Sequence, residues 1–184
     1  MLRTFMLATA GIVTGAIVLG TGAALLGTPA ACVSRAVLPT AAVGQQLATN
    51  WEAFKQQAAR GPASLVVTEE QATSGAADWA RQTGGVISDV RVYFCPDGQA
   101  EAAARITYLG RDLDIVAGGT LDVSGQQAAV RITSVRVGNL PGGVGAAIAN
   151  AALSATTMPA LPMAGITGVQ FTDGKATITG GGSR

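Results

Sequence analysis

Two cysteines and one pair of aspartates are the side chains whose chemistry is easiest to define in this sequence. The chain has 184 residues, contains no histidine, and has Cys32 and Cys95 as its only cysteines. Two cysteines cannot supply the usual four Cys/His ligands of a zinc site. Histidine is the commonest acid and base in enzymes. We therefore expect no metal ion, no cofactor and no enzymatic activity.

The sequence allows more than one chemical role for Cys32. It follows Ala30 and Ala31, the small residues that precede a lipidated cysteine, although Pro29 stands where a branched aliphatic residue is expected. Cys32 is therefore a lipidation candidate. Cys32 and Cys95 could instead form a disulfide outside the cytoplasm. The interpretation we favour leaves Cys95 unpaired within a strand, where a free cysteine packs as a small apolar residue.

Asp112 and Asp114 are two residues apart and would share one face of a strand. Paired carboxylates can act as acid and base or bind calcium. No calcium-loop pattern surrounds them, and Arg111 lies beside them, so we predict a solvated strand face. Gly142 and Gly143 open a helical pattern where an anion could bind. A loop that needs unusual backbone dihedrals is the simpler interpretation.

The N-terminal segment carries no charge from Phe5 to Gly27, and Arg3 precedes it. About 23 helical residues span about 34 Å, enough to cross a hydrocarbon core of ~30 Å. The segment is therefore a retained membrane anchor, the leader of a lipoprotein, or a signal sequence of a secreted protein. All three place the following domain outside the cytoplasm and make the membrane the expected partner.

Composition limits the remaining functions. The 12 basic and 11 acidic residues are nearly balanced, which argues against a nucleic-acid partner. No feature identifies a protein partner. We divide the chain into an anchor or signal segment with a linker (1–38), one domain (39–180) and a disordered tail (181–184), and the domain has the usual size of a single folding unit.

The first half of the domain has helical periodicity. Apolar residues recur at helical spacing after Pro39-Thr40 until Gly61-Pro62 ends the pattern. A short strand is expected around residues 65–67. Thr68-Glu69-Glu70-Gln71 then forms a capping box that starts a second helix. That helix would present Ala72, Ala76, Trp79 and Ala80 on one side.

The second half alternates with a period of two. Residues 90–94 and 99–108 read as strands joined by the turn Pro96-Asp97-Gly98. Strands are also expected at 113–117, 120–123 and 128–137, with a register change near Ser134. A helix follows at 144–155, and a hairpin at 166–179 turns at Asp173-Gly174. The predicted fold is α+β, with one curved antiparallel sheet packed against two to three helices, after an N-terminal transmembrane or signal helix.

The facing surfaces of sheet and helices carry many small apolar residues. Such surfaces either pack very closely or leave an apolar groove. If a groove exists, its lining should come from the larger apolar residues on the same faces. These candidates are Trp51, Phe54, Trp79, Val90, Val92, Phe94, Ile106, Tyr108, Val130, Ile132 and Ile148.

The order of motifs between Thr68 and Thr179 resembles bacterial envelope proteins of the tubular lipid-binding (TULIP-like) superfamily, in particular the mycolate-bacterial phospholipid-binding lipoprotein-like family. The similar features are the capping box, the strand at 90–94 with its Asp97-Gly98 turn, the segment 135–141 before a helix, and the last hairpin. The resemblance implies a long sheet wrapped around a helix, with lipid in the groove. This sequence departs from it by having alanine where large aliphatic residues are expected.

Two functions remain open from sequence. The first is a non-catalytic envelope protein that binds a lipid or another apolar ligand between sheet and helices. The second is a membrane-anchored structural or protein-interaction domain with a solid core.

Overall fold

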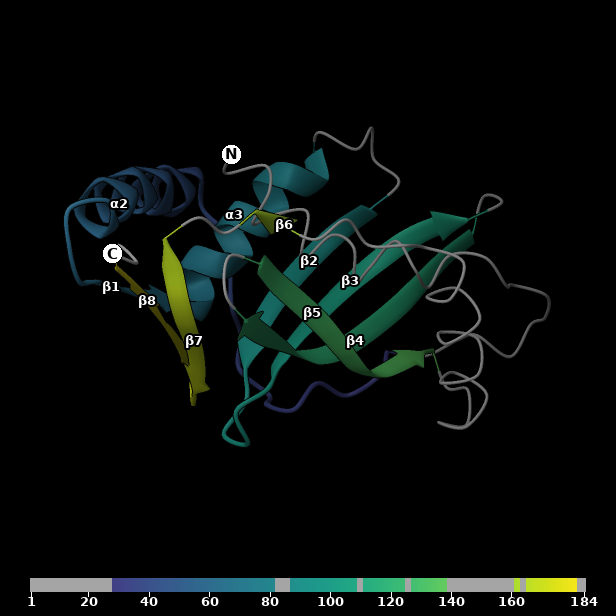
Figure 1. Ribbon diagram of the computed structural model, residues 1–184. Helices are drawn as coiled ribbons and strands as arrows, with labels where there is room; N and C mark the ends of the chain where they lie inside the picture. Colours follow the sequence, from purple (N-terminus) through teal and green to yellow (C-terminus); the bar gives the residue numbers. More distant parts are fainter. Residues whose placement is uncertain are drawn as a thin grey trace.

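The computed structural model describes residues 28–81, 87–108, 111–124, 127–138, 161–162 and 165–181. In these residues two helices accompany two antiparallel sheets, so the α+β class is confirmed. The sheets diverge from one another, and α3 lies between them (Figure 1). The predicted single sheet is wrong, because the first strand and the last hairpin form a sheet of their own.

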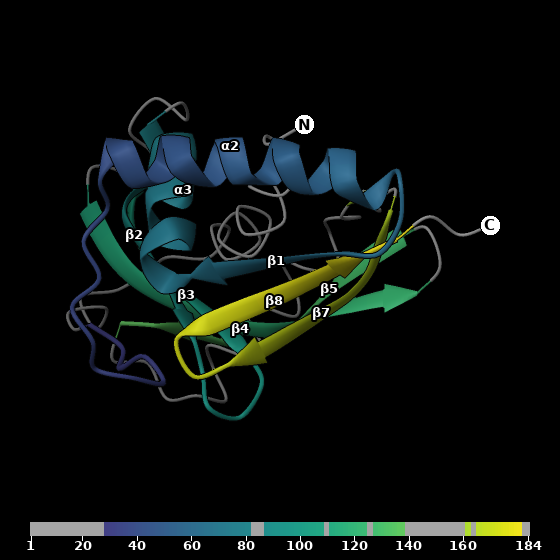
Figure 2. The same cartoon turned by 90° about the vertical axis from the view of Figure 1, so that its left-hand side faces the viewer.

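Helix α2 (Ala41–Ala58) follows the predicted periodicity. Thr40 is its N-cap, and the Thr40 side-chain oxygen accepts a hydrogen bond from the Val43 amide. A capping oxygen of this kind satisfies one of the amides that the first turn leaves without a helical partner. The buried side of α2 includes Leu47, Trp51 and Phe54. Figure 2 shows α2 running alongside β1, with its length roughly parallel to that strand.

The predicted capping box is confirmed where β1 (Ala63–Thr68) meets α3 (Glu69–Arg81). The Thr68 amide donates to Gln71 Oε1 at 3.0 Å, and the Gln71 amide donates to Thr68 Oγ1 at 3.3 Å. These reciprocal bonds fix the direction in which α3 leaves the strand. Ala76 and Ala80 are consequently buried against the core, while Ala72 and Trp79 pack at its margin.

The larger sheet has the strand order β2-β3-β4-β5-β6. Its strands are β2 (Ile87–Phe94), β3 (Ala100–Tyr108), β4 (Arg111–Ser124), β5 (Gln127–Val137) and β6 (Leu161–Pro162). The predicted hairpin between β2 and β3 is confirmed, with Gly98 at φ +80° in its turn. That backbone conformation is accessible to glycine at little steric cost.

The predicted register change in β5 is also confirmed. Gly118 pairs with Ser134, but the next residue, Gly119, pairs with Ile132, so Thr133 is an extra residue. A bulge of this kind moves the alternation by one position. An uninterrupted strand would place Val135 and Ile132 on opposite faces of the sheet. The bulge brings both residues to the same face.

The smaller sheet has the strand order β1-β8-β7. Its hairpin, β7 (Ile166–Thr172) and β8 (Lys175–Gly180), turns at Asp173-Gly174 as predicted. The sheets meet where Phe94 of β2 stacks on Phe171 of β7, with ring centroids 5.5 Å apart. The Gly174 amide also donates to the Phe94 carbonyl at 3.1 Å. The two sheets therefore share one core, in which Ile178 and Ala117 are fully buried.

Side chains of helix α3 form hydrogen bonds with the backbone of β2, the edge strand of the larger sheet. Thr73 Oγ1 accepts from the Val92 amide at 2.9 Å and donates to the Val92 carbonyl at 3.3 Å. Glu69 Oε1 accepts from the Phe94 amide at 2.8 Å. Edge strands otherwise present unpaired backbone groups. This arrangement explains why two polar side chains of α3 are buried.

Several predictions fall on parts of the chain outside the described residues. These are the apolar segment Phe5–Gly27, the helix at 144–155 and the end of the tail. Within the described residues, no helix combines the length and apolar character needed to cross a membrane.

Candidate functional site

The predicted groove residues that the structure describes belong mainly to the core. Trp51 and Phe54 of α2 are buried with Val90, Val92 and Phe94 of β2 in one cluster that also includes both sheets. These side chains therefore lie together, as predicted, and they pack against one another.

The remaining groove candidates divide into two groups. Trp79 and Ile132 are partly buried at the margin of the core. Ile106, Tyr108 and Val130 belong to β3 and β5, but their side chains are outside the described part of the structure, as is the whole of Ile148. Their role in a groove remains a prediction.

A cavity of about 510 Å³ lies instead at the edge of β2, between that strand, the last turns of α3 and residues 37–39. Apolar atoms dominate its lining, from Val37, Leu38, Ala77, Ile87 and Val90 among others. Among the predicted groove residues whose side chains the structure describes, only Val90 contributes. Leu38 is 70% exposed, so this part of the apolar lining faces solvent. The volume falls within the range of sites that enclose small molecules.

A bulge in β2 shapes this cavity. Ser88 pairs with Arg105 and Arg91 with Ala103, so Asp89 and Val90 together face one residue of β3. Asp89 has φ +51°, a conformation that aspartate tolerates better than most side chains. The bulge allows Ile87 and Val90 both to be buried in the core. Bulges often lie beside functional sites.

Charged groups surround the cavity, and most of them are paired. Asp89 accepts from Arg105 at 2.8 Å, and Arg81 pairs with Asp78. The Asp114 carboxylate, 3.1 Å from the Arg105 guanidinium, raises the Arg105 pKa, with Asp89 as a further cause. Arg91 also lines the cavity and is exposed. In the part of the chain that the structure describes, no carboxylate forms an ion pair with Arg91.

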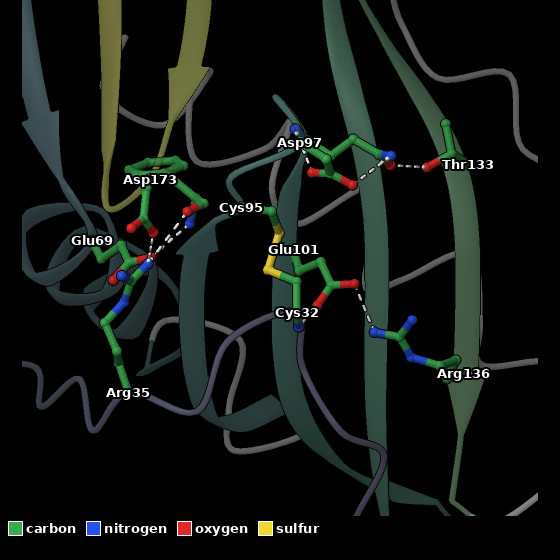
Figure 3. The surroundings of a disulfide bond; sticks show 11 residues. Cys32, Arg35, Glu69, Cys95, Asp97, Glu101, Thr133, Arg136 and Asp173 are labelled. Carbon is green, nitrogen blue, oxygen red and sulfur yellow. Dashed lines mark hydrogen bonds and ion pairs between the residues drawn. A yellow bond between two sulfur atoms is a disulfide. The ribbon is translucent and has the colours of Figure 1, made fainter.

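Residues 28–40, which we call the strap, supply one wall of the cavity through Val37, Leu38 and Pro39. Cys32 and Cys95 form a disulfide with Cα atoms 5.9 Å apart, which corrects the prediction of an unpaired Cys95. The physical reason is that the strap crosses the outer face of the larger sheet, where Cys95 follows β2 (Figure 3). A sulfur in a disulfide cannot carry a lipid thioether, so the disulfide and lipidation of Cys32 exclude each other.

Polar contacts fix the strap on both sides of the disulfide. The Cys32 amide donates to Glu101 Oε2 at 2.5 Å, and Thr28 Oγ1 donates to Asp114 Oδ2 at 2.5 Å. Glu101 is itself buried and pairs with Arg136 at 2.6 Å. Asp114, predicted to lie on a solvated strand face, therefore holds both the strap and Arg105. Asp112 is exposed.

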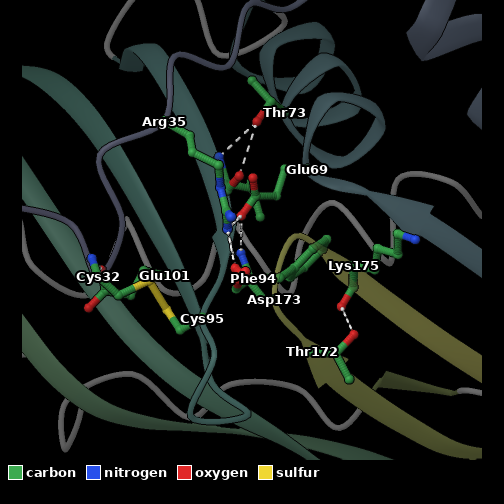
Figure 4. Close-up of polar contacts among 11 residues, drawn as sticks. Cys32, Arg35, Glu69, Thr73, Phe94, Cys95, Glu101, Thr172, Asp173 and Lys175 are labelled. Carbon is green, nitrogen blue, oxygen red and sulfur yellow. Dashed lines mark hydrogen bonds and ion pairs between the residues drawn. A yellow bond between two sulfur atoms is a disulfide. The ribbon is translucent and has the colours of Figure 1, made fainter.

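Arg35 connects the strap to both sheets (Figure 4). Its Nη2 lies 2.7 Å from Asp173 in the β7–β8 turn and 2.9 Å from Glu69 of α3. The hydrogen bond to Asp173, and then that to Glu69, raises the Arg35 pKa. Nη2 also donates to the Phe94 carbonyl at 3.4 Å. Farther along the strap, the Thr40 amide donates to Ser74 Oγ at 3.0 Å, so the residues that line the cavity are held at both ends.

Cys32, Cys95 and Glu101 are also close enough to hold a metal ion, with ligand atoms within 4.8 Å of one another. Both sulfur atoms are in the disulfide, however, and a metal requires the thiolate form. We therefore assign these residues to the attachment of the strap.

Sequence reasoning missed the cavity because it treated residues 33–39 as a simple connection. The only local signal was the apolar character of Val37 and Leu38 within a short linker. Comparison of the chain with protein-family models, curated proteins and solved structures found no match. The TULIP-like resemblance accordingly stays a prediction.

Proposed function

We propose that this chain is a non-catalytic cell-envelope protein that binds a lipid or another apolar ligand between sheet and helix. The observation that carries the proposal is the cavity of about 510 Å³ between α3, β2 and the strap. It has an apolar lining and a charged rim, the combination typical of sites that orient an amphipathic ligand.

The position of the site differs from the predicted groove. The predicted residues Trp51, Phe54, Val92 and Phe94 are buried in the core, whereas the cavity lies at the edge of β2. The ligand would therefore contact Ile87 and Val90 on the strand, Ala77 on the helix, and Val37 and Leu38 on the strap.

The location in the envelope is supported by the disulfide. Disulfides persist in oxidising compartments and are rare in the cytoplasm. The bond between Cys32 and Cys95 spans 63 positions of the sequence and holds the wall of the proposed site, so it is an integral part of the folded domain.

A second function is favoured by a different observation. The packing of Trp51, Phe54 and Phe94 with both sheets suits a membrane-anchored structural or protein-interaction domain with a solid core. In that case the cavity at the edge of β2 would hold only water.

Filling the cavity distinguishes the two functions. Ala77 is partly exposed and lines the cavity, so Ala77→Leu should occupy ligand space and change the free energy of unfolding by less than about 1 kcal/mol. Ala53→Leu is the matched control, because Ala53 is exposed on α2 away from the cavity. Lipid that co-purifies with the full chain would be measured by mass spectrometry.

We expect wild-type protein and Ala53→Leu to carry lipid and Ala77→Leu to lose it. Wild-type protein that carries no lipid and takes up no fatty acid would reject lipid binding and favour the structural function.

A further inference from the structure

The charges at the rim of the cavity point to the chemistry of the ligand. The cavity is lined by two arginines, Arg81 and Arg91, and one aspartate, Asp89. Asp89 is paired with Arg105, and Arg81 is paired with Asp78. Among the described residues that line the cavity, Arg91 is therefore the only cation that forms no ion pair with a carboxylate. The rim therefore has one positive charge available to a ligand.

Arg91 is positioned by the strand rather than by a loop. It is paired in register with Ala103, immediately after the bulge at Asp89 and Val90. Its neighbour Val90 is buried in the core, while Arg91 itself is exposed. The same short segment of β2 thus supplies an apolar wall and a cation. A guanidinium matches an oxyanion through two parallel hydrogen bonds, which makes it suited to carboxylate and phosphate groups.

The size of the cavity favours a small ligand. About 510 Å³ lies within the range that encloses single small molecules. The exposed Leu38 at the mouth extends the apolar surface toward solvent, where an alkyl chain could continue.

We propose that the cavity takes a single-chain amphiphile with an anionic head group, and that Arg91 binds the head group. The inference depends on the proposed function, because it specifies the ligand of the same site. Carboxylate and phosphate monoester head groups share the chemistry that Arg91 recognises.

The test compares ligands that differ only at the head group. Palmitic acid, hexadecyl phosphate and methyl palmitate would each compete with a fluorescent fatty acid for the full chain. We expect the acid and the phosphate to bind at least about tenfold more tightly than the ester, since only they offer a charge-assisted hydrogen bond. Inorganic phosphate should not compete, because it lacks the chain.

Variants separate the head group from the chain. Arg91→Gln should remove the preference for acid over ester and leave ester binding unchanged, whereas Arg91→Lys should keep part of the preference. Arg60→Gln is the matched control, since Arg60 is exposed just beyond α2 and does not line the cavity. It should bind all three ligands like the wild type.

Each contrary outcome has a different meaning. Equal binding of acid and ester, or an unchanged preference in Arg91→Gln, overturns the inference and leaves the proposed function standing. Competition by inorganic phosphate overturns the single-chain amphiphile in favour of a simple anion site. Failure of all three amphiphiles to bind the wild type overturns the proposed function together with the inference.

Discussion

At the scale of single residues, buried polar side chains form hydrogen bonds with backbone groups of neighbouring elements. Thr73 is fully buried, and Glu69 and Glu101 are nearly so. Thr73 and Glu69 satisfy backbone groups of β2, and Glu101 accepts from the strap. A buried polar group is tolerated when it is hydrogen-bonded and costly when it is not. These three residues therefore lie at the positions where α3 and the strap are hydrogen-bonded to the sheet.

Replacement of Thr73 tests this interpretation. Thr73→Val keeps the shape but leaves the buried Val92 amide without its acceptor at 2.9 Å. We expect the free energy of unfolding to fall by about 1–3 kcal/mol. Thr73→Ser keeps the hydroxyl and should lose only about 0.8 kcal/mol for one carbon. Both changes would be measured by urea denaturation. A Thr73→Val protein as stable as the wild type would show that the bond contributes nothing.

At the scale of elements, the sheet and helix α3 are packed closely through alanine. Ala104 of β3 is 6% exposed and pairs with Ile115 of β4 within the core cluster. Because the neighbours on that face are also buried, the space available for a larger side chain is small. Close packing of the alanine-rich face at this position is therefore the expectation that a larger side chain can test.

Ala104→Leu should overpack the core and lower the free energy of unfolding by about 1–3 kcal/mol. Ala103→Leu is the matched control, because Ala103 is adjacent, points to the other face and is only partly buried. It should lose clearly less stability. Thermal melting of both variants measures the difference. If Ala104→Leu melts with the wild type and loses bound lipid instead, the groove extends into this part of the sheet.

The strap is the element that the disulfide holds. A bond that closes a loop of this length is expected to contribute about 2–4 kcal/mol. The double variant Cys32→Ser/Cys95→Ser should be less stable than the oxidised wild type by that amount. Reducing agent should destabilise the wild type to a similar level and leave the double variant unchanged.

The same bond tests the location of the domain in cells. If the domain lies outside the cytoplasm, thiol alkylation of acid-quenched cells should find Cys32 and Cys95 oxidised. Free thiols in cells together with an oxidised bond in the purified protein would place the domain in the cytoplasm and contradict the envelope proposal.

At the scale of the whole molecule, local features were predictable and long-range pairing was not. The capping box at Thr68, the turn at Gly98 and the bulge at Thr133 each depend on neighbouring residues, so their patterns are visible in the sequence. The pairing of β1 with β8 joins Ala63 to Gly180, and alternation within a strand does not identify a partner so distant. The chain therefore forms two sheets where the pattern indicated one.

The candidate site was predictable only in part for the same reason. Val90 was identified from its strand, but the other walls come from the strap and the end of α3, which long-range contacts bring to the edge of β2. Burial of Trp51 and Phe54 was consistent with either a groove or a core, and their apolar character alone could not distinguish the two.

The disulfide has a consequence for how the domain responds to mechanical force. If the chain is pulled from Thr28 and from Gly181, the load passes directly from Cys32 to Cys95 through the sulfur atoms. The intervening 63 steps of the chain, which contain α2, β1, α3 and β2, then lie outside the covalent path of the load. Roughly 220 Å of contour length, at about 3.5 Å per residue, would stay hidden until a reductant opens the bond. The chain length released under tension would therefore come from the strands after Cys95, while α3 and β2, which form one wall of the cavity, would stay within the loop that the disulfide closes.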